Sequence, residues 1–362
     1  MSSRSRILNL VLLLLAASAA LAQNPSPLSP AQISDVEKAV NTFMTQEHAP
    51  SVSVAIVKDG KLAWTGAYGF SDLENSVPAK TSTMYRLASI SKPITATAVM
   101  QLAEVGKLDL DAPIQKYCPA YPAKQWPITA RELLGHLAGV RHYKQPDEWM
   151  STHHYASITD SLDFFKVDPL DFEPKTKYQY STFGFSILGC AVEGASGMKF
   201  MDYLQEKVFR PAGMEHIQTD DTFAIIPNRA RGYRKTEKGE VVNTWLADTS
   251  NKIPGGGMIS TATDLANFAI ATMHATLVSQ PTLEKVWTSQ TTRDGKKTGS
   301  GLDWGLGELK GHKEVSHSGA QPGTSTDLVM LPEMNTAVVV MVNMDGLPAS
   351  ELADKILGDL AP

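Results

Sequence analysis

The fold is organised around residues 87–94, Leu87-Ala88-Ser89-Ile90-Ser91-Lys92-Pro93-Ile94. After this stretch, apolar side chains recur at roughly helical spacing through Val99 and Leu102, and Gly106 is well suited to end the run. The pattern predicts a helix over about 90–105. Pro93 then lies in the first turn, where the N–H that proline lacks is least needed.

Ser89 and Lys92 are three residues apart and therefore share one face of this helix. A serine hydroxyl is a weak nucleophile until a neighbouring base takes its proton, and a lysine amine can be that base only if burial and nearby cations lower its pKa. The pair is a candidate catalytic Ser-x-x-Lys motif. The alternative is a helix-capping serine followed by a solvated lysine, because the motif arises by chance roughly once in a chain of this length.

The composition is that of an ordinary globular protein. A chain of 362 residues can form one large or two moderate domains, and 43% hydrophobic content is ample for a core. The net charge of −5 is dispersed, so no basic patch indicates nucleic acid or an anionic membrane as a partner. Nothing in the sequence specifies an oligomeric state.

The first 22 residues have the pattern of a secretory signal peptide. Arg4 and Arg6 precede an apolar run over 7–15, and small residues follow up to Ala22. The apolar run is shorter than the roughly 20 residues that a spanning helix needs, which favours cleavage after Ala22 over a retained membrane anchor. We therefore expect a periplasmic or secreted protein that begins at Gln23 and has no integral membrane span.

The cysteines and histidines indicate no metal site. Cys118 and Cys190 both lie in apolar surroundings, so two unpaired buried cysteines are expected, with a single disulfide as the alternative that export permits. Three histidines occur between His142 and His154, but the adjacent pair His153-His154 lacks the helical i, i+4 spacing of a zinc site. We expect neither a metal nor another cofactor.

Secondary-structure patterns place strands at both ends of the chain and helices between them. They predict an α+β fold, an α/β sandwich in which one antiparallel sheet takes strands from both termini and is flanked by helices. A mainly helical segment, about 108–250, is inserted in this single domain of residues 31–362, and 23–30 form a flexible linker. The expected elements outside the insertion are helices over 29–44, 262–273 and 350–360 and strands over 51–57, 62–68, 304–307, 317–320, 326–331 and 337–343.

Two further segments carry candidate functional groups. Tyr180, in a Tyr-Ser-Thr turn before an apolar helix over 185–195, could bring a phenol beside the amine of Lys92 so that the two share a proton. Otherwise, this turn only anchors a loop through its hydroxyls. His136 lies at the end of a helical pattern. A single histidine in such a place is more often a core or capping residue than a catalyst.

Three motifs in this order resemble those of a known family. Ser89-Ile90-Ser91-Lys92, Tyr180-Ser181-Thr182 and His317-Ser318-Gly319 are similar to the Ser-x-x-Lys, Tyr-x-Asn and Lys-Thr-Gly motifs of class C β-lactamases and of the related low-molecular-weight penicillin-binding proteins and esterases. Residues 133–139 and 255–264 resemble two more segments of the family. The resemblance covers about residues 30–360 and implies the same fold.

A narrower likeness is to the mitochondrial serine β-lactamase-like proteins, through residues 139–143, 168–174 and 180–184. The segment 143–170 lacks the long charged insertion of those proteins, so filament formation is not implied for this chain.

Two residues depart from the family pattern. Thr182 stands where β-lactamases carry Asn, so the amide that would hold the side chain of a β-lactam is absent. His317 stands where they carry Lys, which weakens the cationic clamp on a substrate carboxylate unless His317 is protonated. Both departures resemble the esterase and peptidase-like members.

The resemblance implies a mechanism for this chain. Ser89 would attack a carbonyl carbon and form an acyl-enzyme, while Lys92 and Tyr180 pass its proton to the leaving group. The backbone N–H groups of Ser89 and Ala320 would bind the oxyanion. The residues expected to contact the substrate are Thr182, His317, Ser318 and Gly319.

The expected function is therefore an exported serine hydrolase that cleaves peptide, amide or ester bonds, of the peptidase, D-amino-acid peptidase or esterase type. A true β-lactamase ranks second because of Thr182 and His317. The alternative from another class is a non-catalytic binding or assembly protein that retains the fold, which would not need all of Ser89, Lys92 and Tyr180. We expect the variable segments 142–166 and 219–246 to form the pocket walls.

Overall fold

The computed structural model describes residues 28–361, so the predicted signal peptide and most of the predicted linker lie outside the described residues. The predicted linker over 23–30 ends a few residues earlier than expected. Leu28 is already buried, and Ser29 caps the first helix, α1 (Pro30–Glu47), in a capping box with Gln32. Within residues 28–361, no helix is long and apolar enough to cross a membrane.

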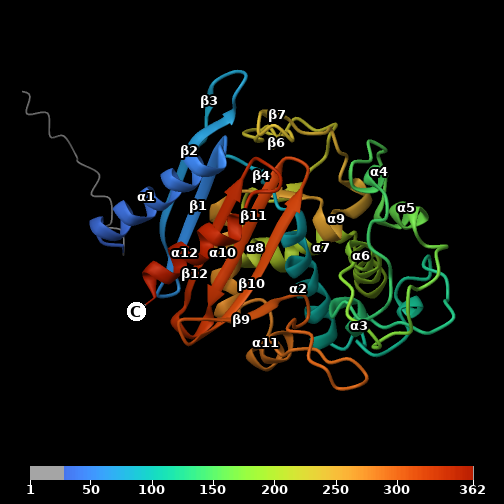
Figure 1. Ribbon diagram of the computed structural model, residues 1–362. Coiled ribbons are helices and arrows are strands. Elements are labelled where there is room, and N and C mark those ends of the chain that lie inside the picture. Colours follow the sequence, from blue (N-terminus) through green and yellow to red (C-terminus); the bar gives the residue numbers. More distant parts are fainter. Residues whose placement is uncertain (1–27, 362) are drawn as a thin grey trace, which may run out of the picture.

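A seven-stranded antiparallel sheet forms the centre of the molecule and takes its strands from both ends of the chain, as predicted (Figure 1). The N-terminal strand β1 pairs with the C-terminal strand β12, with Val54 opposite Val340. In spatial order the strands are β3 (Val77–Pro78), β2 (Lys61–Asp72), β1 (Ser51–Lys58), β12 (Thr336–Val342), β11 (Thr324–Leu331), β10 (His312–Gln321) and β9 (Gly305–Leu309).

Both faces of the central strands are buried, because side chains alternate across a strand and each face is covered by helices. On one face Val338 and Val340 pack in the same apolar cluster as α1 and α12 (Ala349–Leu360). On the other face Val339 and Met341 pack in a larger cluster with α2 (Ser91–Glu104) and α10 (Ala262–Met273). The sheet is thus the middle layer of a sandwich.

The inserted segment is less helical than its sequence patterns predicted. Its longest helix, α6 (Thr182–Ser196), packs against α2 beside the sheet, but several of its other helices are single turns, and residues 214–250 contain short strands instead. The remaining elements are α3 (Ala130–Leu134), α4 (Pro146–Trp149), α5 (Ile158–Ser161), α7 (Phe200–Leu204), α8 (Arg210–Ala212), α9 (Ile253–Gly256), α11 (Gln280–Val286), β4 (Tyr85–Arg86), β5 (Gln218–Thr219), β6 (Tyr233–Lys235), β7 (Val241–Asn243) and β8 (Met258–Ser260).

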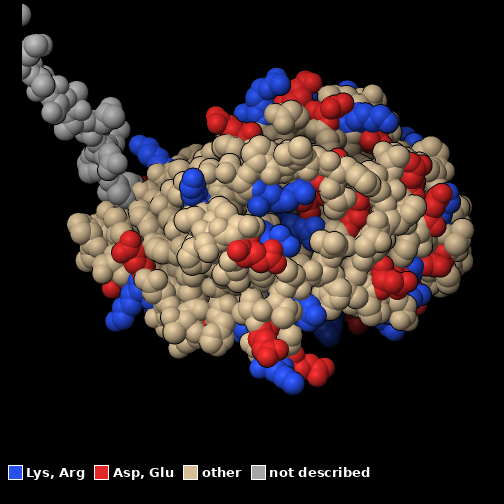
Figure 2. All heavy atoms as spheres, turned by 90° about the horizontal axis from the view of Figure 1, so that it is seen from above, with Lys and Arg blue, Asp and Glu red and all other residues tan. Residues whose placement is uncertain are grey.

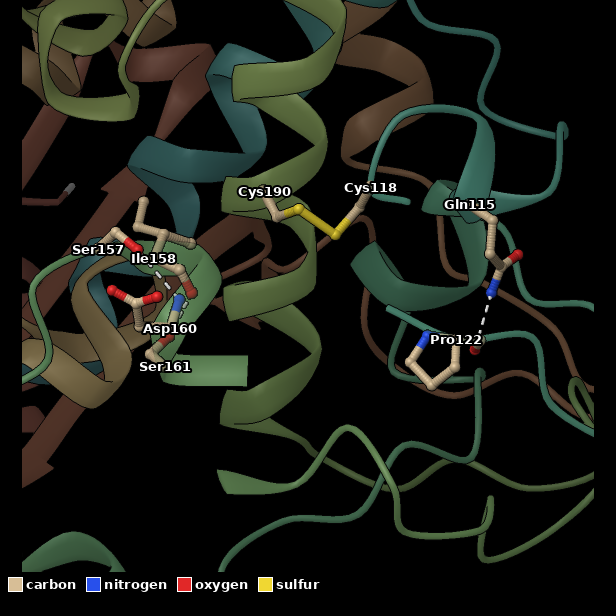
Figure 3. Close-up of a disulfide and its surroundings, with 8 residues drawn as sticks. All are labelled: Gln115, Cys118, Pro122, Ser157, Ile158, Asp160, Ser161 and Cys190. Carbon is tan, nitrogen blue, oxygen red and sulfur yellow. Dashed lines mark hydrogen bonds between the residues drawn. A yellow bond between two sulfur atoms is a disulfide. The ribbon is translucent and has the colours of Figure 1, made fainter. Parts of the chain in front are cut away.

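Cys118 and Cys190 form a disulfide, so the expectation of two unpaired cysteines was wrong (Figure 3). The bond joins the loop after residues 114–116 to α6, across 72 residues of sequence. Gly194 explains how these segments meet, since a Cβ there would lie 1.8 Å from the carbonyl oxygen of Tyr117. Only a glycine permits that approach, which brings the two cysteine Cα atoms to 5.3 Å, a usual disulfide distance.

Candidate active site

Ser89 lies in a single 3₁₀ turn, η1 (Ala88–Ile90), directly before α2. Ala88 has a positive φ of 48°, a strained conformation for a residue with a Cβ. The residues at the two cap positions, Leu87 and Ile90, make no capping hydrogen bond through their side chains, and Lys92 is fully buried. The alternative of a capping serine beside a solvated lysine therefore does not describe this structure.

Lys92 contacts the hydroxyl of Ser89. Its Nζ lies 3.0 Å from Ser89 Oγ and 2.5 Å from the carbonyl oxygen of Gly255, on α9. Burial lowers the pKa of Lys92 to about 7, and the negative charge of Asp303 opposes that change. Near neutral pH a large fraction of this amine is uncharged and able to accept the serine proton.

Tyr180 completes the group from the start of α6. Lys92 Nζ lies 4.8 Å from the centre of its ring, and Tyr180 and Ser89 line the same cavity. Burial, reinforced by the charge of Asp303, raises the pKa of Tyr180 well above 10. Tyr180 is therefore a neutral phenol at working pH, so that of the two candidate bases Lys92 is the one that titrates near neutrality.

Strand β10 passes directly beside η1 and carries the third motif. A Cβ on Gly319 would lie 2.4 Å from the carbonyl oxygen of Leu87 and 2.4 Å from Thr326 Oγ1, so only glycine allows this approach. Thr326 itself donates to that Leu87 oxygen at 3.0 Å, which ties β11 to the same turn. The next residue, Ala320, lines one cavity together with Ser89.

A buried cluster of His136, Asp303 and His317 supports these groups. His136 Nε2 lies 3.2 Å and His317 Nε2 3.6 Å from the same oxygen of Asp303. Burial alone would raise the pKa of Asp303, but the charge of His317 and the hydrogen bond with His136 bring that pKa below its ordinary value. Asp303 therefore remains an anion behind the site.

His136 is a positioning residue rather than a base. Burial lowers its pKa, and its Nδ1 accepts the backbone N–H of Ser181, so the neutral ring carries its proton on Nε2 toward Asp303. The ring packs on Tyr180 with 4.4 Å between ring centres. His136 is thus a buried core residue, one of the roles expected from the sequence, and it also contacts Tyr180.

Thr182 begins α6, and its backbone N–H donates to Nδ1 of His142 at 3.2 Å. Burial, with the charge of Lys92 as the next cause, lowers the pKa of His142 to about 4. The neutral His142 ring therefore carries its proton on Nε2 and lines the cavity beside Thr182. The Nε2–H of His142 is therefore a hydrogen-bond donor near Thr182, the position at which the β-lactamase pattern has the amide of Asn.

A cavity of about 500 Å³ joins these groups at the end of the sheet where β10 turns into β11, the upper end in Figure 1. The view from above shows a hollowed region with Lys and Arg side chains in and around it and Asp and Glu side chains beside them (Figure 2). The variable segments expected to form the walls do contribute to it. The lining residues include Ser89, His142, Tyr143, Trp149, Tyr180, Thr182, Trp245, Lys252, His317, Ser318, Ala320 and Asp345.

The structure thus brings together all the candidate residues, Ser89, Lys92, Tyr180, Thr182, His317, Ser318, Gly319 and Ala320, at one junction of the sheet and the inserted segment. Two groups were missed. Asp303 belongs to no motif that we recognised and only precedes an expected strand, and Lys252 precedes the triple glycine without any signal of its own.

Fold and site together define a protein of the β-lactamase and penicillin-binding-protein class. The chain belongs to the Beta-lactamase family, whose model matches residues 36–361. It is 31% identical to the human mitochondrial serine beta-lactamase-like protein LACTB over 79% of this chain and 69% of that protein. It is 27% identical to penicillin-binding protein 4* of Bacillus subtilis over 83% of this chain and 69% of that protein.

Solved structures agree on the fold. The penicillin binding protein of Bacillus halodurans is 26% identical and superposes with a TM-score of 0.74, over 88% of this chain and 98% of that one. The D-amino acid amidase of Ochrobactrum anthropi SV3, solved with L-phenylalanine amide, is 22% identical with a TM-score of 0.76, over 90% and 98% of the two chains.

Proposed function

We propose that this protein is a serine hydrolase that forms an acyl-enzyme on Ser89 and cleaves amide, peptide or ester bonds. The observation that carries the proposal is the buried amine of Lys92, 3.0 Å from Ser89 Oγ and with a pKa of about 7. A hydroxyl beside an uncharged amine in a cavity has the arrangement of an activated nucleophile. A protein that only retained the fold would have no need of it.

In the proposed reaction, Lys92 takes the proton of Ser89 as Oγ bonds to the substrate carbonyl carbon. The oxyanion that forms accepts hydrogen bonds from the backbone N–H groups of Ser89 and Ala320. The bond to the leaving group then breaks, and the proton passes from Lys92 through Tyr180 to the departing nitrogen or oxygen. Water attacks the acyl-enzyme by the same steps in reverse and frees Ser89.

We place peptide, amide and ester substrates before β-lactams. Thr182 offers no amide, and His317 replaces the lysine of the family pattern. Neighbours of the same fold include D-amino acid amidases, which supports an amide or peptide substrate without specifying one.

Intact-protein mass spectrometry after incubation with a fluorophosphonate tests the proposal. We expect one adduct, on Ser89, and no adduct in the variant Ser89→Ala. That variant should also lose all turnover yet keep its fold, because Ser89 is only half-buried and caps no helix, and even a capping serine typically contributes only about 1 kcal/mol. An unlabelled Ser89 in folded protein would favour the non-catalytic assembly role.

We also propose that the chain is exported to the periplasm or secreted. The signal-peptide pattern of residues 1–22 is one support, and the Cys118–Cys190 disulfide is another, because disulfides persist mainly in oxidising compartments. N-terminal sequencing of the protein recovered from the periplasm or medium should begin at Gln23. Recovery from the cytoplasm with Met1 retained would contradict export.

A further inference from the structure

A second buried lysine, Lys252, lines the same cavity as Ser89. It is 2% exposed, and it is the last residue of a 3₁₀ turn over 250–252, directly before helix α9. Its position is held by the preceding residue, because Asn251 Nδ2 donates to the carbonyl oxygen of Glu148 at 2.9 Å. Lys252 is therefore a built feature of the cavity wall and not a mobile surface side chain.

The ammonium of Lys252 has few partners. Among residues 28–361, its only hydrogen bond is to the carbonyl oxygen of Trp149, at 3.3 Å, and the ring of Tyr143 lies 5.3 Å away. No carboxylate of the described residues lies within 4.0 Å of it. Since an ammonium has three N–H donors, most of its hydrogen-bonding capacity is left for a group in the cavity.

The neighbouring carboxylates are already paired with other groups. Asp220 accepts Arg86 at 2.6 Å and lies 3.2 Å from Arg229. Asp248 lies 2.9 Å from His154 and also accepts Thr222 and Ser250, by hydrogen bonds of 2.7 and 2.8 Å. Both carboxylates are thus within hydrogen-bond or ion-pair distance of groups other than Lys252.

The other groups near Lys252 add positive charge. Burial first, and then the charges of Arg86 and Lys92, lower the pKa of Lys252 to about 7, although Asp220 and Asp248 oppose them. His142 is neutral. Asp345 is the one carboxylate among the described residues that line the cavity, and burial raises its pKa. A buried cation in such a place is stabilised by an anion that enters from outside.

We propose that the substrate carries a free carboxylate and that Lys252 binds it. The inference rests on the proposed hydrolase function and narrows its substrate class. His317 is a weaker cation than the lysine it replaces on β10, and Lys252 supplies a cationic donor from the α9 side of the same cavity. Lys252 is thus a specificity-determining residue, and Lys92 remains the base.

Matched substrate pairs test this inference directly. One pair is mono-p-nitrophenyl glutarate and its methyl ester, with the carboxylate on the acyl part. The other is a dipeptide with a free C-terminal carboxylate and the same dipeptide as its amide. For each pair the measured quantity is kcat/KM of the anionic member divided by that of the neutral member, which cancels any general effect of a substitution.

The variant Lys252→Met keeps an unbranched side chain as far as Cε but lacks the ammonium. We expect this ratio to fall about tenfold or more for one pair, which corresponds to the loss of one charge-assisted hydrogen bond. Lys297→Met, an exposed lysine outside the cavity, is the control and should keep the ratio of the wild type. A fall of less than fivefold in both pairs overturns the inference.

The unaltered protein offers a second measurement if Lys252→Met does not fold. KM of the anionic member should rise relative to that of its neutral partner between pH 6 and pH 9, because Lys252 loses its proton around pH 7 while the substrate carboxylate stays ionised. A ratio of KM values that is flat over this range overturns the inference. Hydrolysis of the neutral esters and labelling of Ser89 report separately on the proposed function.

Discussion

Lys92 shows how burial converts an ordinary amine into a base. It is fully buried, and the loss of hydration lowers its pKa from 10.5 to about 7. Asp303 is near enough to favour the charged form, yet burial outweighs it. Lys92 Nζ donates a hydrogen bond to the carbonyl oxygen of Gly255, which carries no net charge.

The pH dependence of turnover follows from this pKa. We expect kcat/KM for an uncharged ester to rise from pH 6 to pH 8 with a midpoint near 7, because Lys92 accepts the serine proton only after losing its own. Tyr180 contributes no second rise in this range, since its pKa lies well above 10. The rate of fluorophosphonate labelling should follow the same curve, and a flat profile would remove Lys92 as the base.

For single residues, the sequence predicts contacts between positions that are close in the chain and misses contacts between positions that are far apart. Ser89 and Lys92 meet because helix geometry brings residues three apart together, so their spacing was enough. Asp303 and Lys252 reach the site from more than 150 positions further along the chain, as the sequence numbering shows. An isolated Asp or Lys has no spacing partner, so nothing in the sequence distinguishes these two from solvated charges.

At the scale of elements, the site depends on the close approach of β10 to η1. We expect Gly319→Ala to displace the strand, since its Cβ would lie 2.4 Å from the carbonyl oxygen of Leu87. Activity should fall about 100- to 1,000-fold, the usual effect of losing one oxyanion donor, with Ala320 moved away from Ser89. Steady-state kinetics on a chromogenic ester measure the effect.

The control for that substitution is Gly358→Ala, on α12, where a Cβ would meet no atom within 4 Å. It should leave activity unchanged. Full activity in a folded Gly319→Ala protein would show that the tight contact is not what positions the oxyanion site.

The disulfide joins two elements that the chain separates widely, and its removal should destabilise the protein. We expect the paired substitution Cys118→Ser with Cys190→Ser to lower the free energy of unfolding by about 2–4 kcal/mol, because closing a loop of this length restricts the unfolded chain. Urea denaturation with and without a reductant measures the change. Reductant should destabilise the wild type but not the double variant, and equal curves for all samples would contradict the prediction.

Elements with a clear period were predictable, and irregular ones were not. The helix expected over 262–273 is α10 (Ala262–Met273), and Thr261 caps it through its side chain. Both the helical period and the cap depend on residues that are close in sequence. The strands β5, β6 and β7 have only two or three residues each, too few to show a period, and they were missed within a segment predicted to be helical. Pairing of Cys118 with Cys190 was missed for another reason, since it depends on the packing of α6 at Gly194.

For the whole molecule, the site exists only where distant parts of the chain meet. Its cavity takes residues from position 88 to position 345, and the sheet that supports it pairs β1 with β12. The sheet could be predicted because both ends of the chain carry short runs rich in Val and other apolar residues, which are typical of strands. The cavity's shape could not, because its walls include a single helical turn that ends at Trp149 and a loop that carries Trp245, both too short or irregular to show a period.

The same cavity decides how the protein should treat a penicillin. In the proposed mechanism, acylation needs Ser89, Lys92 and the backbone N–H groups of Ser89 and Ala320. Lys92 Nζ lies 3.0 Å from Ser89 Oγ, and Ser89 and Ala320 both line the cavity. Release of the penicilloyl group also needs the opened ring and the attacking water to be held, and Thr182 and His317 lack the amide and the lysine of the β-lactamase pattern.

We therefore expect a penicilloyl adduct on Ser89 that persists after free penicillin is removed by gel filtration, measured by intact-protein mass spectrometry over time. Ser89→Ala should form no adduct. Rapid destruction of penicillin without an adduct would mean that His142 and Lys252, which also line the cavity, replace the missing groups, and the protein would then be a β-lactamase.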